Sequence, residues 1–483
     1  MSKRTYEDSL KQWIKDEKAA IELIGVVGKL WFDKSVELII FRNQMVDRSS
    51  SELLQLHHYA REVVQHPLSI HDTLGVAKAL SRLTLAPSRL DIGRLAVEWL
   101  DEKAKFMDEM DFVAHKMADF VGGDKINLQP KDVILYGFGR IGRIAARELI
   151  AQAGKGEQLR LRAIVTRDKN PDDLFKRADL LRTDSVHGNF LGTVVTDAEN
   201  SCLWVNGHKI HVINAETPEE IDYTQFGINN ALLIDNTGAW RDRAGLSRHF
   251  ASKGVEKVLL TAPGKGDIPN IVHGVNNETL DVQSDNIWSA ASCTTNAIVP
   301  ILKVVNEHLG IEKGHIESVH SFTNDQNLLD NYHKKFRRGR SAVMNLVITE
   351  TGAESAIAKV LPELSGKFTG NAIRVPTPNV SLAVLNIQLT KKTTKEAVNE
   401  IMRQAALKGD LVEQIQYSFS QELVSSDLVG NSSAAIFDAP ATIISRDGKS
   451  IVLYVWYDNE YGYTRQVIRF AKQLAGVIRL RYY

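Results

Sequence analysis

Cysteine is scarce in this 483-residue sequence, which contains only Cys202 and Cys293. Two cysteines are too few for a disulfide scaffold, so we expect a protein of a reducing, intracellular compartment. Neither sign of charge prevails, because Lys+Arg and Asp+Glu both number 59, which argues against nucleic-acid binding through bulk positive charge. Long apolar runs are missing as well. Residues 21–31 are interrupted by Glu22 and Lys29 and fall short of the ~20 residues that a membrane span needs.

The remaining composition is that of an ordinary globular protein. Hydrophobic residues make up 43% and charged residues 24% of the chain, which excludes collagen-like, low-complexity and wholly disordered classes. Residues 1–8 lead into further charges and not into an apolar core, so they do not form a secretory signal. We therefore expect a soluble, cytoplasmic protein of about three domains, without a membrane or nucleic-acid partner.

Residues 1–130 show helical spacing of apolar residues. The clearest stripe runs from Ile92 to Phe120 in steps of three, four or seven, which predicts the core-facing side of a helix. Ser88–Asp91 and Ser49–Glu52 look like capping-box starts, and Gly122-Gly123 ends the last helix. We predict an all-α N-terminal domain with four or five helices. The residues leave open whether it also binds a partner.

From residue 131 onward, short β-rich runs alternate with helical stretches. The runs 132–136, 159–165, 231–235 and 255–261 predict βαβ units and a doubly wound parallel sheet. After about residue 315 the runs become longer and closer together, as in 383–389 and 450–456. This second pattern predicts an α+β domain with a mixed or antiparallel sheet.

The first chemical signal is Gly137-Phe138-Gly139-Arg140-Ile141-Gly142, a G-x-G-x-x-G that follows a predicted strand and opens a helix. In that setting the glycines allow a tight turn and let a pyrophosphate approach the helix N-terminus. We therefore predict a dinucleotide site.

The acid that usually binds the adenosine ribose is missing from the end of the second strand. That strand ends in Thr166-Arg167, and Asp168 comes one residue late. Arg167 could face the 2′-phosphate of NADP, or it could be an ordinary surface arginine. At this point the choice of cofactor stays open.

The second chemical signal is Cys293, which lies between Ser292 and Thr294 just before an apolar helical run. A helix N-terminus can stabilise a thiolate, although a lone cysteine is more often a small buried hydrophobic residue. His320 shifts the interpretation, because a cysteine and a histidine far apart in sequence can meet as nucleophile and base. Cys202 has no such surroundings, and we interpret it as structural.

From about residue 133 to 474 the chain resembles the phosphorylating glyceraldehyde-3-phosphate dehydrogenase family, in a long form with an additional N-terminal segment. The segments that carry this resemblance stand in the family's order: 137–143, 184–188, 261–266, the Cys293 segment, 320–326, 364–370, 374–381 and 456–463. The resemblance implies an oxidoreductase of glycolysis or gluconeogenesis that converts glyceraldehyde 3-phosphate, phosphate and NAD(P) to 1,3-bisphosphoglycerate. Cys293 would form the thioacyl intermediate and His320 would act as base.

The resemblance also implies the binding residues, a homotetramer and the domain boundaries. Substrate and phosphate would be held by Ser292, Thr294, Thr323, Asp325, Arg338, Thr351, Gly352 and Arg374. The cofactor would be held by Gly137, Phe138, Gly139, Arg140, Ile141, Gly142, Arg167, Thr237, Gly238, Thr261, Asn459 and Tyr463. No metal site is predicted. We expect a helical extension over residues 1–130, a Rossmann domain over 131–292 that the C-terminal segment 459–483 rejoins, and a catalytic domain over 293–458.

The sequence departs from the family pattern near the cofactor. Tyr136 replaces an asparagine before the first glycine, Arg167 stands where the ribose-binding acid is expected, and Asn331-Tyr332 replace a Leu-Pro pair of NAD-dependent members. These departures favour NADP, or use of both cofactors, over strict NAD. Two other functions stay open: erythrose-4-phosphate dehydrogenase activity, and a non-catalytic regulatory protein whose helical extension binds a partner.

Overall fold

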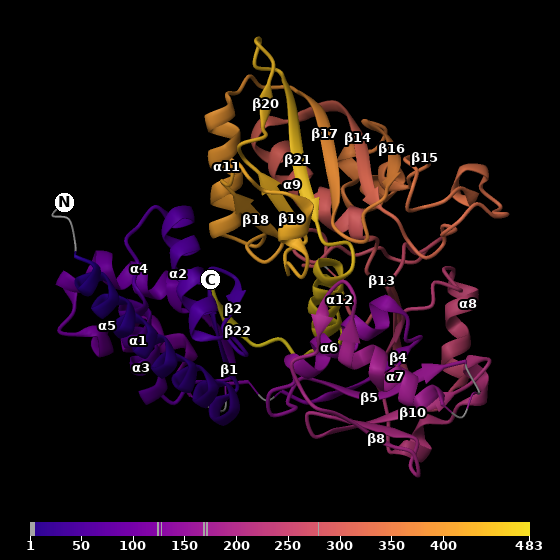
Figure 1. The fold of residues 1–483 in the computed structure, drawn as a ribbon, viewed down its shortest axis with the longest axis horizontal. Coiled ribbons are helices and arrows are strands. Elements are labelled where there is room, and N and C mark those ends of the chain that lie inside the picture. Colours follow the sequence, from indigo (N-terminus) through magenta and orange to yellow (C-terminus); the bar gives the residue numbers. More distant parts are fainter. Residues whose placement is uncertain (1–4, 123–124, 127, 168–169, 171, 279) are drawn as a thin grey trace. The chain divides into compact units, whose positions relative to one another are not determined.

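The computed structural model describes residues 5–122, 125–126, 128–167, 170, 172–278 and 280–483 (Figure 1). The chain divides into two compact units. Unit 1 comprises Met1–Gln129, Gly154–Glu157 and Ile478–Tyr483, and unit 2 comprises Pro130–Ala153 and Gln158–Val477. No helix among the described residues combines the length and apolar character needed to cross a bilayer.

Unit 1 is mainly helical, and two of its helices begin at capping boxes. Ser49 caps the second helix together with Glu52, as the sequence predicted, and Ser69 with Asp72 caps the third. The helices are α1 (Tyr6–Lys34), α2 (Ser50–Val64), α3 (Ile70–Arg82), α4 (Ile92–Glu102) and α5 (Glu109–Lys116). Buried residues from all of these helices form one hydrophobic core.

The expected all-α character of this region is wrong in one respect, because unit 1 contains a four-stranded sheet. Its strands are β1 (Val36–Ile40), β2 (Asn43–Gln44), β3 (Ser88–Asp91) and β22 (Leu480–Tyr482), in the order β2-β1-β3-β22. The predicted helix start at Ser88–Asp91 is therefore a strand, and Asp91 alone caps α4 by accepting from the N–H groups of Gly93 and Arg94. Short 3₁₀ turns at Lys103–Lys105 and Ala118–Phe120 also divide the predicted stripe 92–120.

The last residues of the chain complete this sheet. β22 pairs with β3 in parallel, with Leu480 opposite Ser88. Arg479 is buried, lies over the Trp31 ring at 4.5 Å and forms an ion pair with Glu37 at 3.5 Å. Residues 478–483 thus belong to unit 1, which differs from the expectation that all of 459–483 rejoins the Rossmann domain.

The first large sheet of unit 2 is the predicted doubly wound sheet. Its strand order is β13-β12-β11-β4-β5-β10-β9-β8, with parallel pairing from β13 to β10 and antiparallel pairing beyond. The strands are β4 (Lys131–Tyr136), β5 (Leu159–Thr166), β8 (Val194–Asp197), β9 (Cys202–Val205), β10 (His208–Asn214), β11 (Ala231–Asp235), β12 (Val255–Leu260) and β13 (Ile287–Ser289). The accompanying elements are α6 (Arg140–Ala151), α7 (Asp173–Arg182), α8 (Arg243–Ser247) and the short hairpin β6 (Thr183–Asp184) and β7 (Gly188–Asn189).

The second large sheet is mixed, as the sequence predicted. Its order is β15-β16-β14-β17-β21-β19-β18, with β20 paired to β21. The strands are β14 (Ile311–Ser321), β15 (Val347–Thr349), β16 (Phe368–Val375), β17 (Ser381–Leu389), β18 (Ile415–Ser418), β19 (Ala435–Asp438), β20 (Ile443–Ile444) and β21 (Ser450–Tyr457). The helices are α9 (Cys293–Leu309), α10 (Ala353–Val360), α11 (Lys395–Leu407) and α12 (Tyr461–Leu474).

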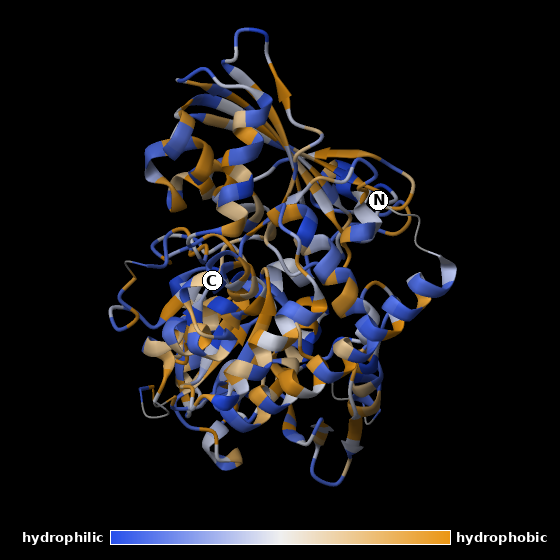
Figure 2. Ribbon diagram, turned by 90° about the vertical axis from the view of Figure 1, so that its left-hand side faces the viewer, coloured by the Kyte–Doolittle hydropathy of each residue, from blue (hydrophilic) through white to orange (hydrophobic). Residues whose placement is uncertain are grey.

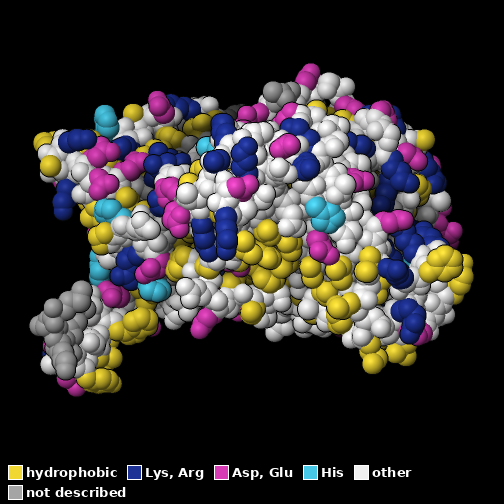
Figure 3. All heavy atoms as spheres, turned by 90° about the horizontal axis from the view of Figure 1, so that it is seen from above, with side chains coloured by type: hydrophobic (Ala, Val, Ile, Leu, Met, Phe, Trp, Pro, Cys, Tyr) yellow, Lys and Arg dark blue, Asp and Glu magenta, His cyan; other side chains and the backbone are white. Residues whose placement is uncertain are grey.

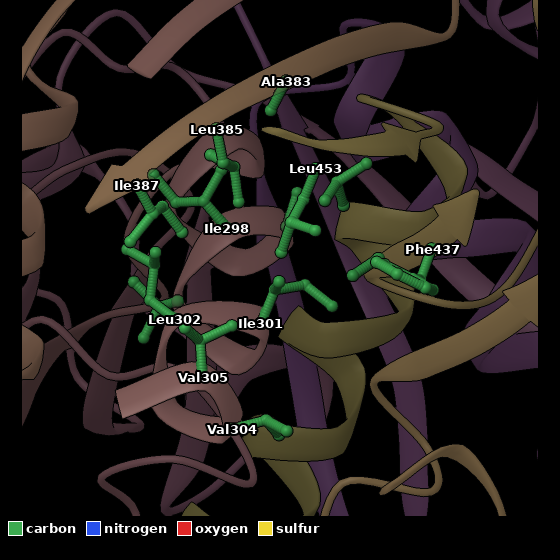
Figure 4. Close-up of a cluster of buried hydrophobic side chains, with 14 of the residues drawn as sticks. Ile298, Ile301, Leu302, Val304, Val305, Ala383, Leu385, Ile387, Phe437 and Leu453 are labelled. Atoms are coloured by element: carbon green, nitrogen blue, oxygen red, sulfur yellow. The ribbon is translucent and has the colours of Figure 1, made fainter. Parts of the chain in front are cut away.

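Burial of apolar residues fixes α9 and α12 in unit 2. Figure 2 shows hydrophobic residues concentrated on the strands of the large sheets, whereas the helices alternate between hydrophobic and hydrophilic residues. In Figure 4, Ile298, Ile301 and Leu302 of α9 point toward the side chains of β17 and β21. α12 packs on α6 beside the first sheet, where Arg465 forms a buried ion pair with Glu148. The apolar packing of α9 holds this helix, which begins at Cys293, against the second sheet.

Candidate active site and cofactor cradle

Cys293 is the first residue of the 17-residue helix α9. A sharp turn precedes it, in which Ala291 has a positive φ of 55°. Ser292 is the N-cap, and its hydroxyl accepts a hydrogen bond from the N–H of Thr295 at 3.0 Å. The thiol therefore lies at the positive end of a helix dipole, which favours a thiolate.

His320 approaches this thiol from β14. Its Nε2 lies 3.7 Å from the Cys293 Sγ. Its Nδ1 is 2.7 Å from the carbonyl oxygen of Ser321 and 2.9 Å from the Arg374 Nη1. Because the shorter contact is with an acceptor, we assign the ring hydrogen to Nδ1, which donates to this carbonyl. The Nε2 lone pair then faces the thiol. The structure thus brings together the cysteine and histidine that the sequence singled out.

Burial keeps both groups neutral in the resting site. Burial raises the pKa of the Cys293 thiol, while a hydrogen bond from Thr294 and the positive charge of Arg374 oppose it. Burial and then Arg374 lower the pKa of His320 to about 4. At neutral pH the imidazole is therefore unprotonated and can accept the thiol proton.

Strand register places Arg374 beside the Cys–His pair. β16 pairs with β14 in parallel, and Arg374 stands opposite His320. The Arg374 Nη1 donates to the Ser321 carbonyl at 3.1 Å and to the Thr323 hydroxyl at 3.3 Å. The predicted substrate residues Thr323 and Arg374 thus lie next to the candidate nucleophile.

A second arginine and a carboxylate complete this group. Thr323 donates to Asp325, and the Arg338 Nη1 donates to the same carboxylate at 2.5 Å. Burial and the nearby positive charge of Arg338 lower the pKa of Arg374. Two guanidinium groups around one carboxylate leave a net positive charge, which suits a phosphate.

The other predicted phosphate residues lie at two helix N-termini. Thr351 and Gly352 precede α10, where the Thr351 hydroxyl accepts from the N–H of Ala353 at 3.3 Å. Ser292 and Thr294 lie at the start of α9. Among the described residues, Thr351 and Gly352 form hydrogen bonds within the first turn of α10 and not with Cys293, His320 or Arg374, so their joint action stays a prediction.

The glycine-rich turn between β4 and α6 forms a cradle. Gly137 has a φ of +93°, and a Cβ at Gly142 would lie 2.3 Å from the Gly137 carbonyl oxygen. By contrast, a Cβ at Gly139 would meet nothing within 4 Å. Gly139 lines a cavity of about 300 Å³. A pyrophosphate fits such a site, because backbone can approach it without side chains in the way.

Only part of the predicted cofactor set lines this cavity. Gly137, Phe138, Gly139, Arg167 and Thr237 do so. The remaining residues take other positions: Arg140 forms ion pairs with Asp184 and Glu460, Ile141 packs on the core, and Thr261 donates to the carbonyl of Asp235. Gly238 follows Thr237 with a φ of +61°. Tyr463 lies near Cys293, since it donates to the Ala291 carbonyl at 3.0 Å, and Asn459 accepts from Ser381 at 3.1 Å.

The family of the chain follows from comparison with known proteins. Residues 131–243 match the model of the glyceraldehyde 3-phosphate dehydrogenase NAD-binding domain, and residues 292–459 match that of the C-terminal domain. The chain belongs to the glyceraldehyde-3-phosphate dehydrogenase family. It is therefore an oxidoreductase of a family that binds a nicotinamide cofactor.

Individual relatives differ in how much of the chain they match. A glyceraldehyde-3-phosphate dehydrogenase-like protein of Pseudomonas aeruginosa is 51% identical over 94% of this chain and 98% of its own length. Glyceraldehyde-3-phosphate dehydrogenases of Priestia megaterium and of a Nostoc species are both 40% identical, over 71% of this chain and 97% or 98% of their own lengths. The first similarity is long enough to include most of unit 1.

Two residues near the site of this dehydrogenase family member escaped the sequence reasoning. The Tyr457 hydroxyl lies 3.0 Å from the hydroxyls of both Thr294 and Ser318 and ties the start of α9 to the second sheet. The sequence feature that could have identified Tyr457 is its place in the family segment 456–463. The second is Arg177 of α7, which lines the cofactor cavity together with Arg167.

The guanidinium of Arg177 is bound to the carboxylate of Asp173, which also accepts a hydrogen bond from Thr166. Its Nε donates to Asp173 at 2.9 Å, and Thr166 donates to the same carboxylate at 3.3 Å. The signal was the (i, i+4) spacing of Asp173 and Arg177 on one helix. Asp168, the acid that the sequence placed one residue late, lies outside the described residues. Arg167, which follows β5, and Arg177 of α7 thus both line the cavity.

Proposed function

We propose that this protein is a phosphorylating glyceraldehyde-3-phosphate dehydrogenase. The observation that carries the proposal is the 3.7 Å approach of the His320 Nε2 to the Cys293 Sγ at the start of α9. The neighbouring Arg374 supports it, because the substrate carries a phosphate that a guanidinium can bind. In this proposal Cys293 is the nucleophile and His320 is its base.

The first step joins the aldehyde to the enzyme. The Cys293 proton moves to the His320 Nε2, and the thiolate attacks the aldehyde carbon while the carbonyl electrons move to oxygen. That oxygen takes the proton back from His320, which gives a neutral hemithioacetal. His320 then removes the hydroxyl proton as the hydride leaves the carbon, and the product on Cys293 is a thioester. When bound, the nicotinamide ring supplies the hydride acceptor.

The second step releases the product. An oxygen of inorganic phosphate attacks the thioester carbon, the C–S bond breaks, and Cys293 leaves as a thiolate that regains its proton from His320. The acyl phosphate formed is 1,3-bisphosphoglycerate. In our proposal Arg374, Thr323 and Asp325 hold the phosphate of the substrate. The attacking phosphate is held by Ser292, Thr294, Arg338, Thr351 and Gly352.

We further infer that the enzyme uses NADP, or both cofactors, in preference to NAD alone. Arg167 and Arg177 line the cavity at the end of β5, and the carboxylate of Asp173 is engaged by Arg177 and Thr166. A 2′-phosphate suits paired guanidinium groups, whereas ribose hydroxyls call for a carboxylate acceptor. In this proposal the positive charge of the two arginines favours NADP, whose 2′-phosphate is negative, over NAD.

A steady-state assay with each cofactor tests this inference. We expect Arg167→Ala and Arg177→Ala each to lower kcat/KM for NADP by about 10- to 100-fold, because a charge-assisted hydrogen bond contributes ~1.5–3 kcal/mol. The value for NAD should change by less than about threefold. A strong preference of the unmodified enzyme for NAD would refute the role given to these arginines.

The activity itself is tested with glyceraldehyde 3-phosphate and phosphate, on the unmodified enzyme and on Cys293→Ser. We expect loss of acyl-phosphate formation in the variant. Undiminished turnover would rule out covalent catalysis, and the absence of turnover in the unmodified enzyme would favour a non-catalytic protein. Erythrose 4-phosphate, assayed in parallel, decides the substrate. The cytoplasmic location and the homotetramer stay predictions that fractionation and a mass measurement can check.

A further inference from the structure

The first helix has two apolar faces, and only one of them contributes to the core of unit 1. The core face carries Leu23, Val27 and Leu30, which are fully or almost fully buried. A neighbouring face exposes large apolar side chains: Leu10, Trp13, Ile14, Ile21, Ile24 and Phe32. In Figure 3, hydrophobic side chains gather on the segment at the lower left, where α1 begins. We call this second face the α1 seam.

The spacing within the α1 seam is that of a helix–helix contact. Leu10, Ile14, Glu17, Ile21, Ile24 and Gly28 follow one another in alternating steps of four and three. This is the narrow repeat through which one helix packs against another in a coiled coil. A helix that lies on a lipid surface needs a wider apolar face and a basic polar face, and the first turn of α1 carries Glu7 and Asp8.

The shape of the α1 seam matches a second copy of itself in antiparallel orientation. Its first half is bulky, whereas Gly25 and Gly28 in its second half have no atom within 4 Å of a Cβ position. Antiparallel pairing places Leu10 of one copy against Gly28 of the other and Ile14 against Ile24. A two-fold contact requires this kind of self-complementarity.

The exposed area agrees with a stable dimer contact. The six apolar residues and Tyr6, which continues the seam, are 36% to 76% exposed. With ~200 Å² for a fully exposed large side chain, they leave about 700 Å² accessible, close to the ~800 Å² that each partner buries in a standard interface. We propose that α1 pairs with the α1 of a second copy of this chain, antiparallel and along this seam.

Glu17 is the one charged residue of the α1 seam and provides a specific signature. In the antiparallel register it lies opposite Ile21 of the other copy, where its carboxylate loses water without gaining a partner from the seam. A polar group at such a position fixes register while weakening the association. Replacement of Glu17 by leucine should therefore tighten the pairing.

The mass of the full-length protein in solution tests the pairing, measured by sedimentation velocity over a range of concentrations. We expect Ile21→Glu to lower the assembly mass at least twofold and Glu17→Leu to lower the concentration needed for assembly at least tenfold. Ser9→Glu adds the same charge to the same helix outside the seam and should leave the mass unchanged. Equal masses for the unmodified protein, Ile21→Glu and Glu17→Leu would overturn the proposal.

Cysteine cross-linking tests the orientation, in full-length Cys293→Ser protein. Under mild oxidation the double variant Ile14→Cys/Ile24→Cys should give a covalent dimer on a non-reducing gel, because residues 14 and 24 face each other only between antiparallel copies. Within one helix the two positions are about 15 Å apart and cannot bond. Each single variant should stay monomeric on the gel. A dimer from Ile24→Cys alone, or none from the double variant, would overturn the antiparallel register.

Discussion

The buried ion pair between α6 and α12 gives the sharpest stability prediction. The side chains of Arg465 and Glu148 are only 6% and 5% exposed, and Arg465 Nη1 lies 2.5 Å from the carboxylate. Gln152 also donates to this carboxylate at 2.7 Å. Replacement of Arg465 by methionine keeps a similar volume and leaves the carboxylate buried with two neutral donors, Gln152 and Tyr461.

The expected loss of stability is large because the charged carboxylate of Glu148 remains buried without its ion-pair partner. Removal of one partner of a buried pair destabilises a protein by ~3–5 kcal/mol. Unit 2 has roughly 340 residues, so its unfolding entropy at Tm is about 0.7 kcal/mol/K. A loss of ~4 kcal/mol then lowers Tm by about 5 °C. The double variant Arg465→Met/Glu148→Gln removes both charges and should recover most of the loss.

The pH dependence of Tm separates this explanation from simple loss of packing. Burial raises the pKa of Glu148, but Arg465 and the hydrogen-bond donors outweigh burial and hold it below its ordinary value. In Arg465→Met the hydrogen bonds from Gln152 and Tyr461 remain, but burial outweighs them and the pKa of Glu148 rises, so the folded variant binds a proton that the unfolded chain has lost. The Tm difference should thus be full at pH 7.5 and shrink toward pH 5 in scanning calorimetry. A difference below 1 °C, or one independent of pH, would refute the reasoning.

Three further predictions concern the cradle, the base and the end of the chain. Gly142→Ala forces a methyl group to within 2.3 Å of the Gly137 carbonyl oxygen, so cofactor affinity in a fluorescence titration should fall at least tenfold. His320→Asn should slow alkylation of Cys293 at pH 7 by about 10- to 100-fold. In the unmodified enzyme the same rate should show no inflection near pH 6.5, because the pKa of His320 is about 4. Deletion of residues 478–483 should make unit 1 sensitive to protease while unit 2 stays resistant; equal resistance of both would contradict the role of β22.

Local sequence patterns accounted for much of the fold and for the reacting pair. The glycine fingerprint at Gly137 could be predicted because its three glycines are required by the conformation of the turn between strand and helix. The capping box at Ser49 likewise depends only on residues within one helical turn. Cys293 and His320 lie 27 residues apart, but the family segments around both were specific enough to pair them. Their 3.7 Å approach in the structure agrees with that pairing, and their catalytic roles stay predictions.

Features that depend on distant partners were not predictable in this way. Ser88–Asp91 has the composition of a helix start, yet it is a strand because β1 and β22 pair with it on both sides. Arg177 joins Arg167 only because α7 folds back over the end of β5. In both cases the deciding neighbour comes from another element, and a local sequence pattern does not identify which element that is.

Because β22 stands at the end of the sequence, the sheet of unit 1 is begun early in synthesis and completed only at its end. On the ribosome β3 is synthesised about 390 residues before β22, which at ~5–20 residues per second corresponds to roughly 20–80 s. During that interval one edge of β3 has no neighbouring strand, and such an edge can pair with other chains. The first unit to emerge from the ribosome is thus the last to be completed, and an interrupted chain that lacks only its final residues keeps that edge open.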